Sequence, residues 1–300
     1  MNTPRFTQLS KCRKSLGGAL LLAALTLPVF GAREAHASLI VHLKLDEGTG
    51  TTTANSVEGG ADGTLVGAGS SWTTAVPENF ISSAAYYNSG SKGDSVTLPN
   101  TSVGALGDFT IAGWINAVEY TGAGGGNDRI LSKRNLTANA SFIDLGFYNV
   151  AGGGVGIGLD VQVAGGPVDP KVASSAIDFS EGWLFVAATR NSDTGEIELY
   201  IGKPGETGVT RIGVGTDTAG LLAANTALLM IGNTEANIDR NGKVMFSDFR
   251  IYDTVLSASE LESVRLEAIP EPGTTAMMIM AAPALAFFSL LKGRKGAAAN

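Results

Sequence analysis

Few residues of this chain could carry out catalysis. Between Ser38 and Glu267 the only histidine is His42, and the nucleophile context Gly-x-Ser-x-Gly does not occur in the sequence. We interpret His42, which lies in an alternating apolar segment, as a sheet-surface or core residue rather than a general base. Glu196 and Glu198 share one face of a strand, but glycoside hydrolysis needs two carboxylates that flank the bond being cut. We interpret these two as a solvent-facing pair and predict that the chain is not an enzyme.

One aromatic residue on a predicted strand could bind a ligand. The period-two pattern places Phe109, Ile111 and Ile115 on one strand face and Trp114 on the other. An exposed indole ring could stack on a sugar, whereas a ring covered by a loop or by other strands, the commoner case, belongs to the core. We keep Trp114 as the candidate ligand-binding residue.

Amino-acid composition and net charge argue against several classes of site and binding partner. Cys12, the only cysteine, lies near the N-terminus in a signal-like segment, so the rest of the chain has no thiol for a disulfide, a soft-metal site or a nucleophile. Residues 38–269 carry 13 Lys and Arg against 26 Asp and Glu, a formal charge of 13 − 26 = −13. This balance argues against nucleic acid and anionic lipid as partners of the folded part. It fits a surface kept soluble outside the cell or suited to divalent cations.

The first 37 residues have the pattern of a secretory signal peptide. Basic residues from Arg5 to Lys14 precede the apolar run Leu16–Phe30, and Ala35-His36-Ala37 is a small-x-small cleavage signal. We expect residues 1–37 to be removed on export, so that the mature chain begins at Ser38.

The elements between Ser38 and Glu267 are typical of one all-β domain. Short alternating or apolar runs recur at the spacing of a sandwich, separated by Gly, Asn, Asp and Pro turns. A short helix is expected after Ser257, because Ser257 and Glu260 form a capping box ahead of apolar residues at helical spacing. We predict strands over residues 38–46, 84–88, 94–98, 109–116, 129–133, 142–149, 155–163, 183–190, 196–201, 227–231 and 244–252.

Five stretches of this body resemble one family, both in sequence and in order. They are LKLDEGTGTTTANSVEGGADGTL from Leu43, FTIAGWI from Phe109, ILSKR from Ile130, GWLFVAATRNSDTGEIELYI from Gly182 and SDFRIYDTVLSASELESV from Ser247. Together they are similar to the LamG-like jellyroll domains of the concanavalin A-like lectin/glucanase superfamily, over nearly all of residues 38–267. The resemblance implies a two-sheet antiparallel jellyroll sandwich with a short C-terminal helix.

The resemblance also implies a metal site. Members of this superfamily often hold a structural calcium where the first loop meets the last strand, and the oxygen donors at the matching positions are Asp46, Asn55, Asp62 and Asp248. Each also has an ordinary interpretation, since Asp46 ends a strand, Asn55 and Asp62 shape turns, and Asp248 lies on a polar strand face. Structural calcium is the only cofactor that we expect.

The C-terminal segment resembles a sorting signal. Residues 268–273 form a linker that contains Pro270, Glu271 and Pro272, and residues 274–291 carry no charge and are long enough for a transmembrane helix. A basic cytoplasmic tail is expected over residues 292–300. This order is similar to the PEP-CTERM signal, which implies recognition by an exosortase-type membrane enzyme of a Gram-negative bacterium. A plain tail anchor is the alternative.

These features favour non-catalytic binding or adhesion. We expect an exported protein that is membrane-anchored during sorting and then delivered to the cell surface or extracellular matrix, with a glycan of the extracellular polymer as its ligand. The step from fold to glycan is an analogy, because the same sandwich also serves as a structural or protein-binding spacer. A glycan-cleaving enzyme of the same fold is the third hypothesis.

Overall fold

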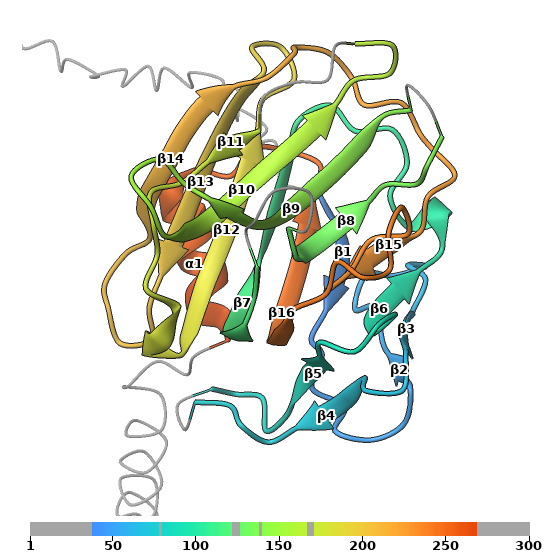
Figure 1. The fold of residues 1–300 in the computed structure, drawn as a ribbon, viewed down its shortest axis with the longest axis vertical. Coiled ribbons are helices and arrows are strands. Elements are labelled where there is room, and N and C mark those ends of the chain that lie inside the picture. Colours follow the sequence, from blue (N-terminus) through green and yellow to red (C-terminus); the bar gives the residue numbers. More distant parts are fainter. Residues whose placement is uncertain (1–37, 78–79, 122–126, 138–139, 167–170, 269–300) are drawn as a thin grey trace, which may run out of the picture. The chain divides into compact units, whose positions relative to one another are not determined.

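The computed structural model describes residues 38–77, 80–121, 127–137, 140–166 and 171–268 (Figure 1). They form two sheets of antiparallel strands packed face to face, which confirms the predicted sandwich. Sheet A has the order β14 (Thr210–Thr216), β13 (Glu196–Gly202), β12 (Trp183–Arg190), β7 (Phe109–Glu119), β16 (Lys243–Tyr252), β5 (Ala85–Ser89) and β4 (Ser71–Thr73), with β1 (Leu39–Leu43) also pairing with β16.

Sheet B lies in front of sheet A in Figure 1. Its order is β11 (Val172–Ala173), β10 (Val155–Gln162), β9 (Phe142–Asn149), β8 (Arg129–Lys133), β15 (Leu229–Ile231), β6 (Ser95–Leu98), β3 (Gly63–Val66) and β2 (Thr52–Thr53). Two short 3₁₀ turns, η1 (Asn100–Ser102) and η2 (Phe179–Glu181), and the helix α1 (Ala258–Glu267) complete the described elements.

The main core lies between the two sheets. Phe109 and Ile111 of β7 point into it from sheet A, and Leu145 and Phe147 of β9 do so from sheet B; each is at most 1 % exposed. Burying a side chain of this kind stabilises the fold by about 1.5–3 kcal/mol. Because neighbouring side chains of a strand point to opposite faces, the same strands present a second set of residues on the two outer faces.

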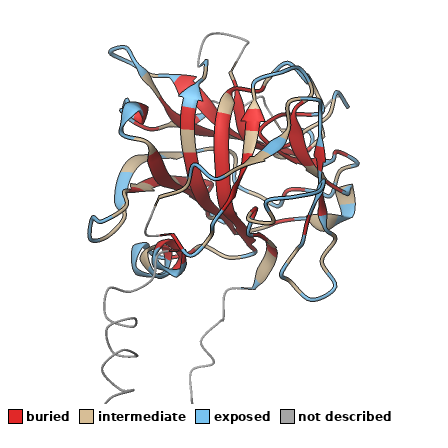
Figure 2. Ribbon diagram, turned by 90° about the horizontal axis from the view of Figure 1, so that it is seen from below, coloured by how far each residue is buried: buried red, intermediate tan, exposed pale blue. Residues whose placement is uncertain are grey.

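The outer face of sheet A is covered. The predicted capping box starts α1: the Ser257 hydroxyl accepts a hydrogen bond from the Glu260 N–H at 3.3 Å, and the Glu260 carboxylate accepts one from the Ser257 N–H at 2.7 Å. Leu261 and Val264 of α1 are buried against a cluster of aromatic residues on this sheet. Figure 2 shows α1 outside the sandwich, with the buried parts of the strands above it. Within the described residues α1 is the one α-helix, and it packs on sheet A.

All eleven predicted strands are present in the described residues, and three have the predicted bounds: β8, β9 and β12. Five short or weakly patterned strands were not predicted, namely β2, β3, β4, β11 and β14.

The predicted signal peptide over residues 1–37 and the sorting segment over 270–300 lie outside the described residues. In the part of the chain that is described, no helix has both the length and the apolar character needed to span a membrane.

Candidate functional site

Trp114 lies in the interior of the protein. Its side chain on β7 is 0 % exposed and packs against Phe80, with ring centroids 4.8 Å apart, and against Phe185 of β12 at 5.6 Å. It does lie on the strand face opposite Phe109 and Ile111, but α1 and Phe80 pack on this face. The assignment of Trp114 as a ligand-binding residue is therefore wrong, because a covered ring cannot stack on a sugar.

The oxygen donors expected to bind calcium have partners within the protein. The Asp248 carboxylate accepts a hydrogen bond from Arg250 Nη2 at 3.1 Å and lies 2.7 Å from His42 Nε2. Asn55 Oδ1 accepts one from the His42 backbone N–H at 3.1 Å, and Asp62 Oδ1 accepts one from the Asn55 backbone N–H at 3.0 Å. These are the contacts of an ion pair and of turns.

The fourth donor, Asp46, accepts a hydrogen bond of 3.4 Å from the Ser82 hydroxyl. Within the described ranges, no three Asp, Glu, His or Cys side chains gather as metal ligands. The residues Asp46, Asn55, Asp62 and Asp248 therefore do not fit a single calcium site. Calcium binding by the chain stays a prediction, which the melting temperature with and without a chelator would test.

The other residues considered for chemistry form structural contacts. His42 Nε2 lies within hydrogen-bond distance of the Asp248 carboxylate, where β1 meets β16. Glu198 accepts a hydrogen bond from the Tyr200 hydroxyl at 2.6 Å and pairs with Arg211, which ties β13 to β14.

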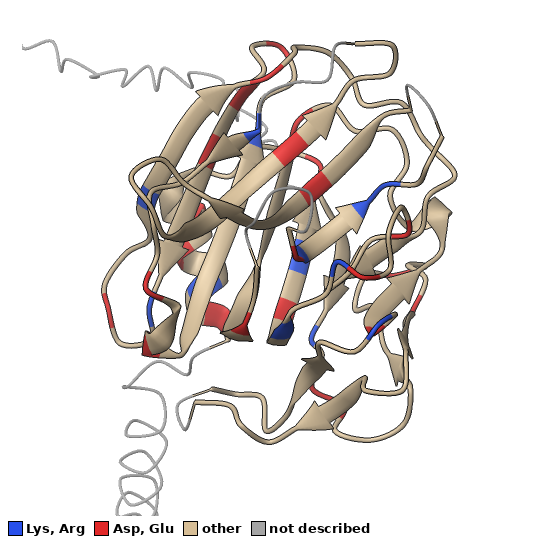
Figure 3. Ribbon diagram, in the orientation of Figure 1, with Lys and Arg blue, Asp and Glu red and all other residues tan. Residues whose placement is uncertain are grey.

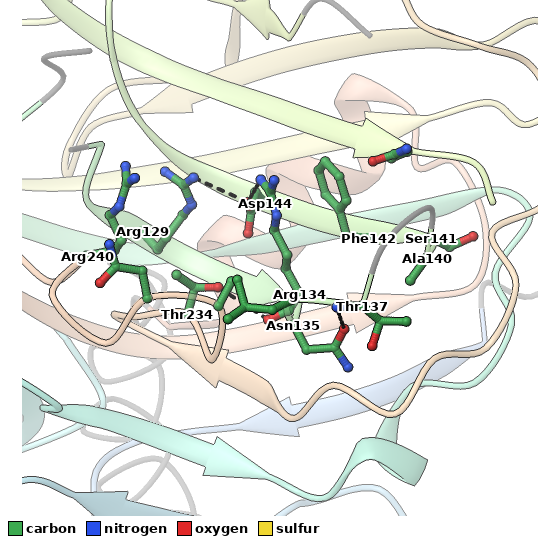
Figure 4. A pocket seen from close by; sticks show the side chains of 14 residues that line it. Arg129, Arg134, Asn135, Thr137, Ala140, Ser141, Phe142, Asp144, Thr234 and Arg240 are labelled. Carbon is green, nitrogen blue, oxygen red and sulfur yellow. Dashed lines mark hydrogen bonds and ion pairs between the residues drawn. The ribbon is translucent and has the colours of Figure 1, made fainter. Parts of the chain in front are cut away.

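A polar pocket lies on the outer face of sheet B, near the ends of β8 and β9. Its volume is about 540 Å³. Its walls come from β8 and β9, from the described residues of the connection between them, from β10, and from the segment between β15 and β16 (Figure 4). Most of the lining residues are polar or charged: Arg129, Arg134, Asn135, Leu136, Thr137, Ala140, Ser141, Phe142, Asp144, Gln162, Thr234, Ala236, Asn237 and Arg240. We call it the Asp144 pocket.

Asp144 of β9 is the charged centre of this pocket. Its side chain is 0 % exposed and accepts hydrogen bonds from the Ser132 hydroxyl at 2.5 Å and from Arg134 Nη1 at 3.0 Å. Arg129 Nη2 lies 3.2 Å from the same carboxylate. A buried ion needs such partners, because the loss of its hydration costs on the order of several kcal/mol. Two arginines share this one carboxylate.

The backbone brings Arg129 close to Asp144. The pairing of β8 with β9 shifts register between Arg129 and Leu131, and Arg129 lies opposite Gly146. A Cβ atom at Gly146 would come within 2.5 Å of the Asp128 carbonyl oxygen. A larger residue there would push β8 away from β9, so glycine at this position keeps the cluster together.

Two further contacts shape the walls of the pocket. The Arg134 guanidinium carbon lies 4.0 Å from the centre of the Phe142 ring, a cation–π contact that covers the ring. Arg240 comes from the segment between β15 and β16, and its carbonyl oxygen accepts a hydrogen bond from the Arg129 N–H at 2.9 Å. Figure 4 shows Arg240 beside Arg129 at one end of the pocket.

A second carboxylate lies next to the pocket. Asp160 of β10 pairs directly opposite Asp144 of β9, and Figure 3 shows the acidic positions of these two strands side by side. Burial, and then the charge of Asp144, raise the pKa of Asp160 to about 6. This face of sheet B therefore has one carboxylate held by two arginines and one that titrates near pH 6.

Sequence reasoning identified β8 and β9 as strands but assigned none of their side chains to a site. The available signal was the charge of Arg129, Asp144 and Asp160 on strands whose other face is apolar. An ordinary solvated strand face has the same pattern. The pocket also depends on Arg240, which only the fold brings to β8.

Comparisons with known proteins agree with this architecture. In fold the chain is similar to domain 4 of AbnA, a GH43 extracellular arabinanase from Geobacillus stearothermophilus, with 16 % identity and a TM-score of 0.54 over 76 % of this chain and 98 % of that one. It is also similar to the binding domain of Paraclostridial Mosquitocidal Protein 1, with 17 % identity and a TM-score of 0.53 over 75 % of this chain and 51 % of that one.

At these identities the similarity concerns the fold alone. No curated protein sequence matches the chain. Residues 89–262, more than half of the chain, match the concanavalin A-like lectin/glucanases superfamily. The chain belongs to this superfamily, as the sequence resemblance implied.

Proposed function

We propose that the chain is a non-catalytic glycan-binding protein that holds its ligand in the Asp144 pocket. The observation that carries this proposal is the density of polar side chains around one hollow on the outer face of sheet B. A volume of about 540 Å³ is within the range of small-molecule sites. The hydroxyl groups of a sugar need many hydrogen-bond partners, and the amide, hydroxyl and guanidinium groups of the lining can provide them.

The similar structures support binding as the use of this fold. The arabinanase domain is described in complex with arabinotriose, and the domain of the mosquitocidal protein is described as a binding domain. Because identity is low, the position of the ligand is argued only from the residues of this chain.

We also propose that the protein is exported and sorted to the cell surface or extracellular matrix. The support is the signal-like pattern of residues 1–37 and the Pro270-Glu271-Pro272 segment with its apolar and basic continuation. An exosortase-type enzyme would be its membrane partner. Locating the full-length protein and a variant without residues 270–300 in cells tests this proposal. The truncated variant is expected to be absent from the cell surface.

A pull-down of the purified protein on a panel of bacterial and plant polysaccharides tests the binding proposal. Arg134→Ala removes a guanidinium that is 35 % exposed at the pocket, and it should weaken retention at least tenfold. The control is Arg211→Ala, which removes an exposed arginine from β14 of sheet A and should leave retention unchanged. Equal loss in both variants, or no retention of the unmodified protein, would favour the spacer hypothesis.

One observation favours a glycan-cleaving enzyme as the second candidate. Asp144 and Asp160 are direct cross-strand neighbours, so two carboxyl groups do lie close together on an outer sheet face. Against this, the Asp144 side chain is 0 % exposed and its oxygens are held by Ser132, Arg129 and Arg134. We expect no release of reducing ends from any polysaccharide that the protein retains. Release that Asp160→Asn abolishes would replace the binding proposal with hydrolysis.

A further inference from the structure

Basic side chains gather at the Asp144 pocket although the folded part of the protein is acidic. Arg129, Arg134 and Arg240 are three of the 13 Lys and Arg between residues 38 and 269, where Asp and Glu number 26. The lining contains a single carboxylate, Asp144, and it already serves two of these arginines. The lining residues thus carry three guanidinium groups against one carboxylate, and two further carboxylates, Asp160 and Asp128, lie next to the pocket.

Arg240 is the third of these arginines. Its half-buried guanidinium forms no side-chain hydrogen bond or ion pair with another described residue, although the Asp144 and Asp128 carboxylates lie close enough to act on its charge. The preceding acid, Asp239, pairs instead with Lys92 at 3.0 Å, and the nearby Asp128 accepts a hydrogen bond from the Thr121 N–H at 2.6 Å. Burial, and then the positive charge of Arg129, lower the pKa of Arg240, while the Asp144 carboxylate acts in the opposite direction.

The described surface offers little for the stacking of sugar rings. Among the described residues no Phe, Tyr or Trp is exposed, and the one aromatic ring that lines the pocket, Phe142, lies under the Arg134 guanidinium. A ligand in this pocket must therefore be held by hydrogen bonds and charge. A guanidinium forms two parallel hydrogen bonds with a carboxylate, and such charge-assisted bonds are about twice as strong as neutral ones.

We propose that the pocket selects glycans that carry a carboxylate, as uronic acid residues do, and that Arg240 is the residue that binds this group. The inference rests on the proposed function, since it names the ligand class of the same pocket. Arg240 donates to the ligand carboxylate, because of the three arginines of the pocket it is the one whose guanidinium forms no ion pair. Arg129 and Arg134 stay on Asp144 and provide the positive field around it.

Calorimetric titration of the full protein tests this inference. The probes are short oligosaccharides of alginate, polygalacturonate and hyaluronan, each beside its carboxyl-reduced form, which keeps the sugar backbone and removes the charge. At least one acidic oligosaccharide should bind at least tenfold more tightly than its reduced form. Arg240→Gln should weaken that binding at least tenfold, whereas Arg211→Gln, with its arginine on sheet A, should leave it unchanged. Equal melting temperatures of the two variants show that both are folded.

Each other outcome has a definite meaning. Equal binding of acidic and reduced forms, or retention only on neutral polysaccharides, overturns the carboxylate inference and leaves the proposed function in place. Tighter binding of a sulfated oligosaccharide without carboxylates overturns it in favour of sulfate esters. No binding to any of these probes or to the polysaccharide panel overturns both proposals.

Discussion

The two outer faces of the sandwich differ in what covers them. On sheet A, the aromatic residues Trp114, Trp183 and Phe185 are buried under Phe80 and the helix α1. On sheet B, Asp144 is held by arginines beneath a pocket of about 540 Å³. The helix α1 follows β16 after a short connection and is the last element of the described residues. The difference indicates that the aromatic residues on the outer face of sheet A serve stability, and it underlies our proposal that the polar face of sheet B holds the ligand.

This comparison also separates what could be predicted from the sequence from what could not. The strands β8, β9 and β12 were predicted with their bounds, because each is a short alternating or apolar run between turn residues. β14 was missed because Ile212 and Val214 alternate with glycines and polar residues and are not fully buried. Which outer face is covered depends on α1 and Phe80, far from Trp114 along the chain, and period-two alternation contains no such information.

The largest effect is expected on the outer face of sheet A. Trp114→Ala should lower the free energy of unfolding by about 3–5 kcal/mol, because it empties a space lined by Phe80 and Phe185. Denaturant unfolding measures it, with Val118→Ala as the control, since Val118 lies on the same strand and is 51 % exposed. Should Trp114→Ala not fold, Trp114→Phe should still show a smaller loss. A neutral Trp114→Phe would contradict the assignment of this face to stability.

The second-largest effect on stability is expected at the buried ion cluster of Asp144, Arg129 and Arg134 on sheet B. Asp144→Asn should destabilise the fold by about 2–4 kcal/mol, because it leaves Arg129 and Arg134 without their counter-charge in a partly dry site. Asp193→Asn, at an exposed turn, is the matched control and should change stability by less than about 0.5 kcal/mol. Equal effects of the two substitutions would show that the cluster is solvated like an ordinary surface.

Replacing Asp160 should change the free energy of unfolding in the opposite direction from replacing Asp144. Its pKa is about 6 in the folded protein against an ordinary value of 3.8, so between these pH values the folded state binds more protons than the unfolded chain. The free energy of unfolding should therefore fall as pH rises from about 4 to about 6 and stay lower above that. The charges that face Asp160 are those of Asp144, Arg134, Arg129 and Lys171.

Asp160→Asn should remove this part of the pH dependence and stabilise the protein at pH 7 by about 1–2 kcal/mol. Thermal unfolding of both proteins from pH 4 to pH 8 measures the difference. If the stability of the two proteins changed with pH in parallel, Asp160 would be better hydrated than its position beside Asp144 implies.

The smallest effect concerns the cap of the covering helix. Ser257→Ala removes the hydroxyl that accepts the Glu260 N–H, and it should cost about 1 kcal/mol. Ser263→Ala, a serine in the body of the same helix, should cost less. If the two substitutions lower the free energy of unfolding equally, the capping box contributes little to holding α1 on sheet A.

The central claim, that the outer face of sheet B is the binding face, is tested most directly by hydrogen exchange. Backbone amide exchange is measured with and without the polysaccharide that the protein retains best. We expect protection in β8, in β9 and in the segment between β15 and β16, and none in α1 or β14. Protection confined to sheet A or its helix would contradict the account.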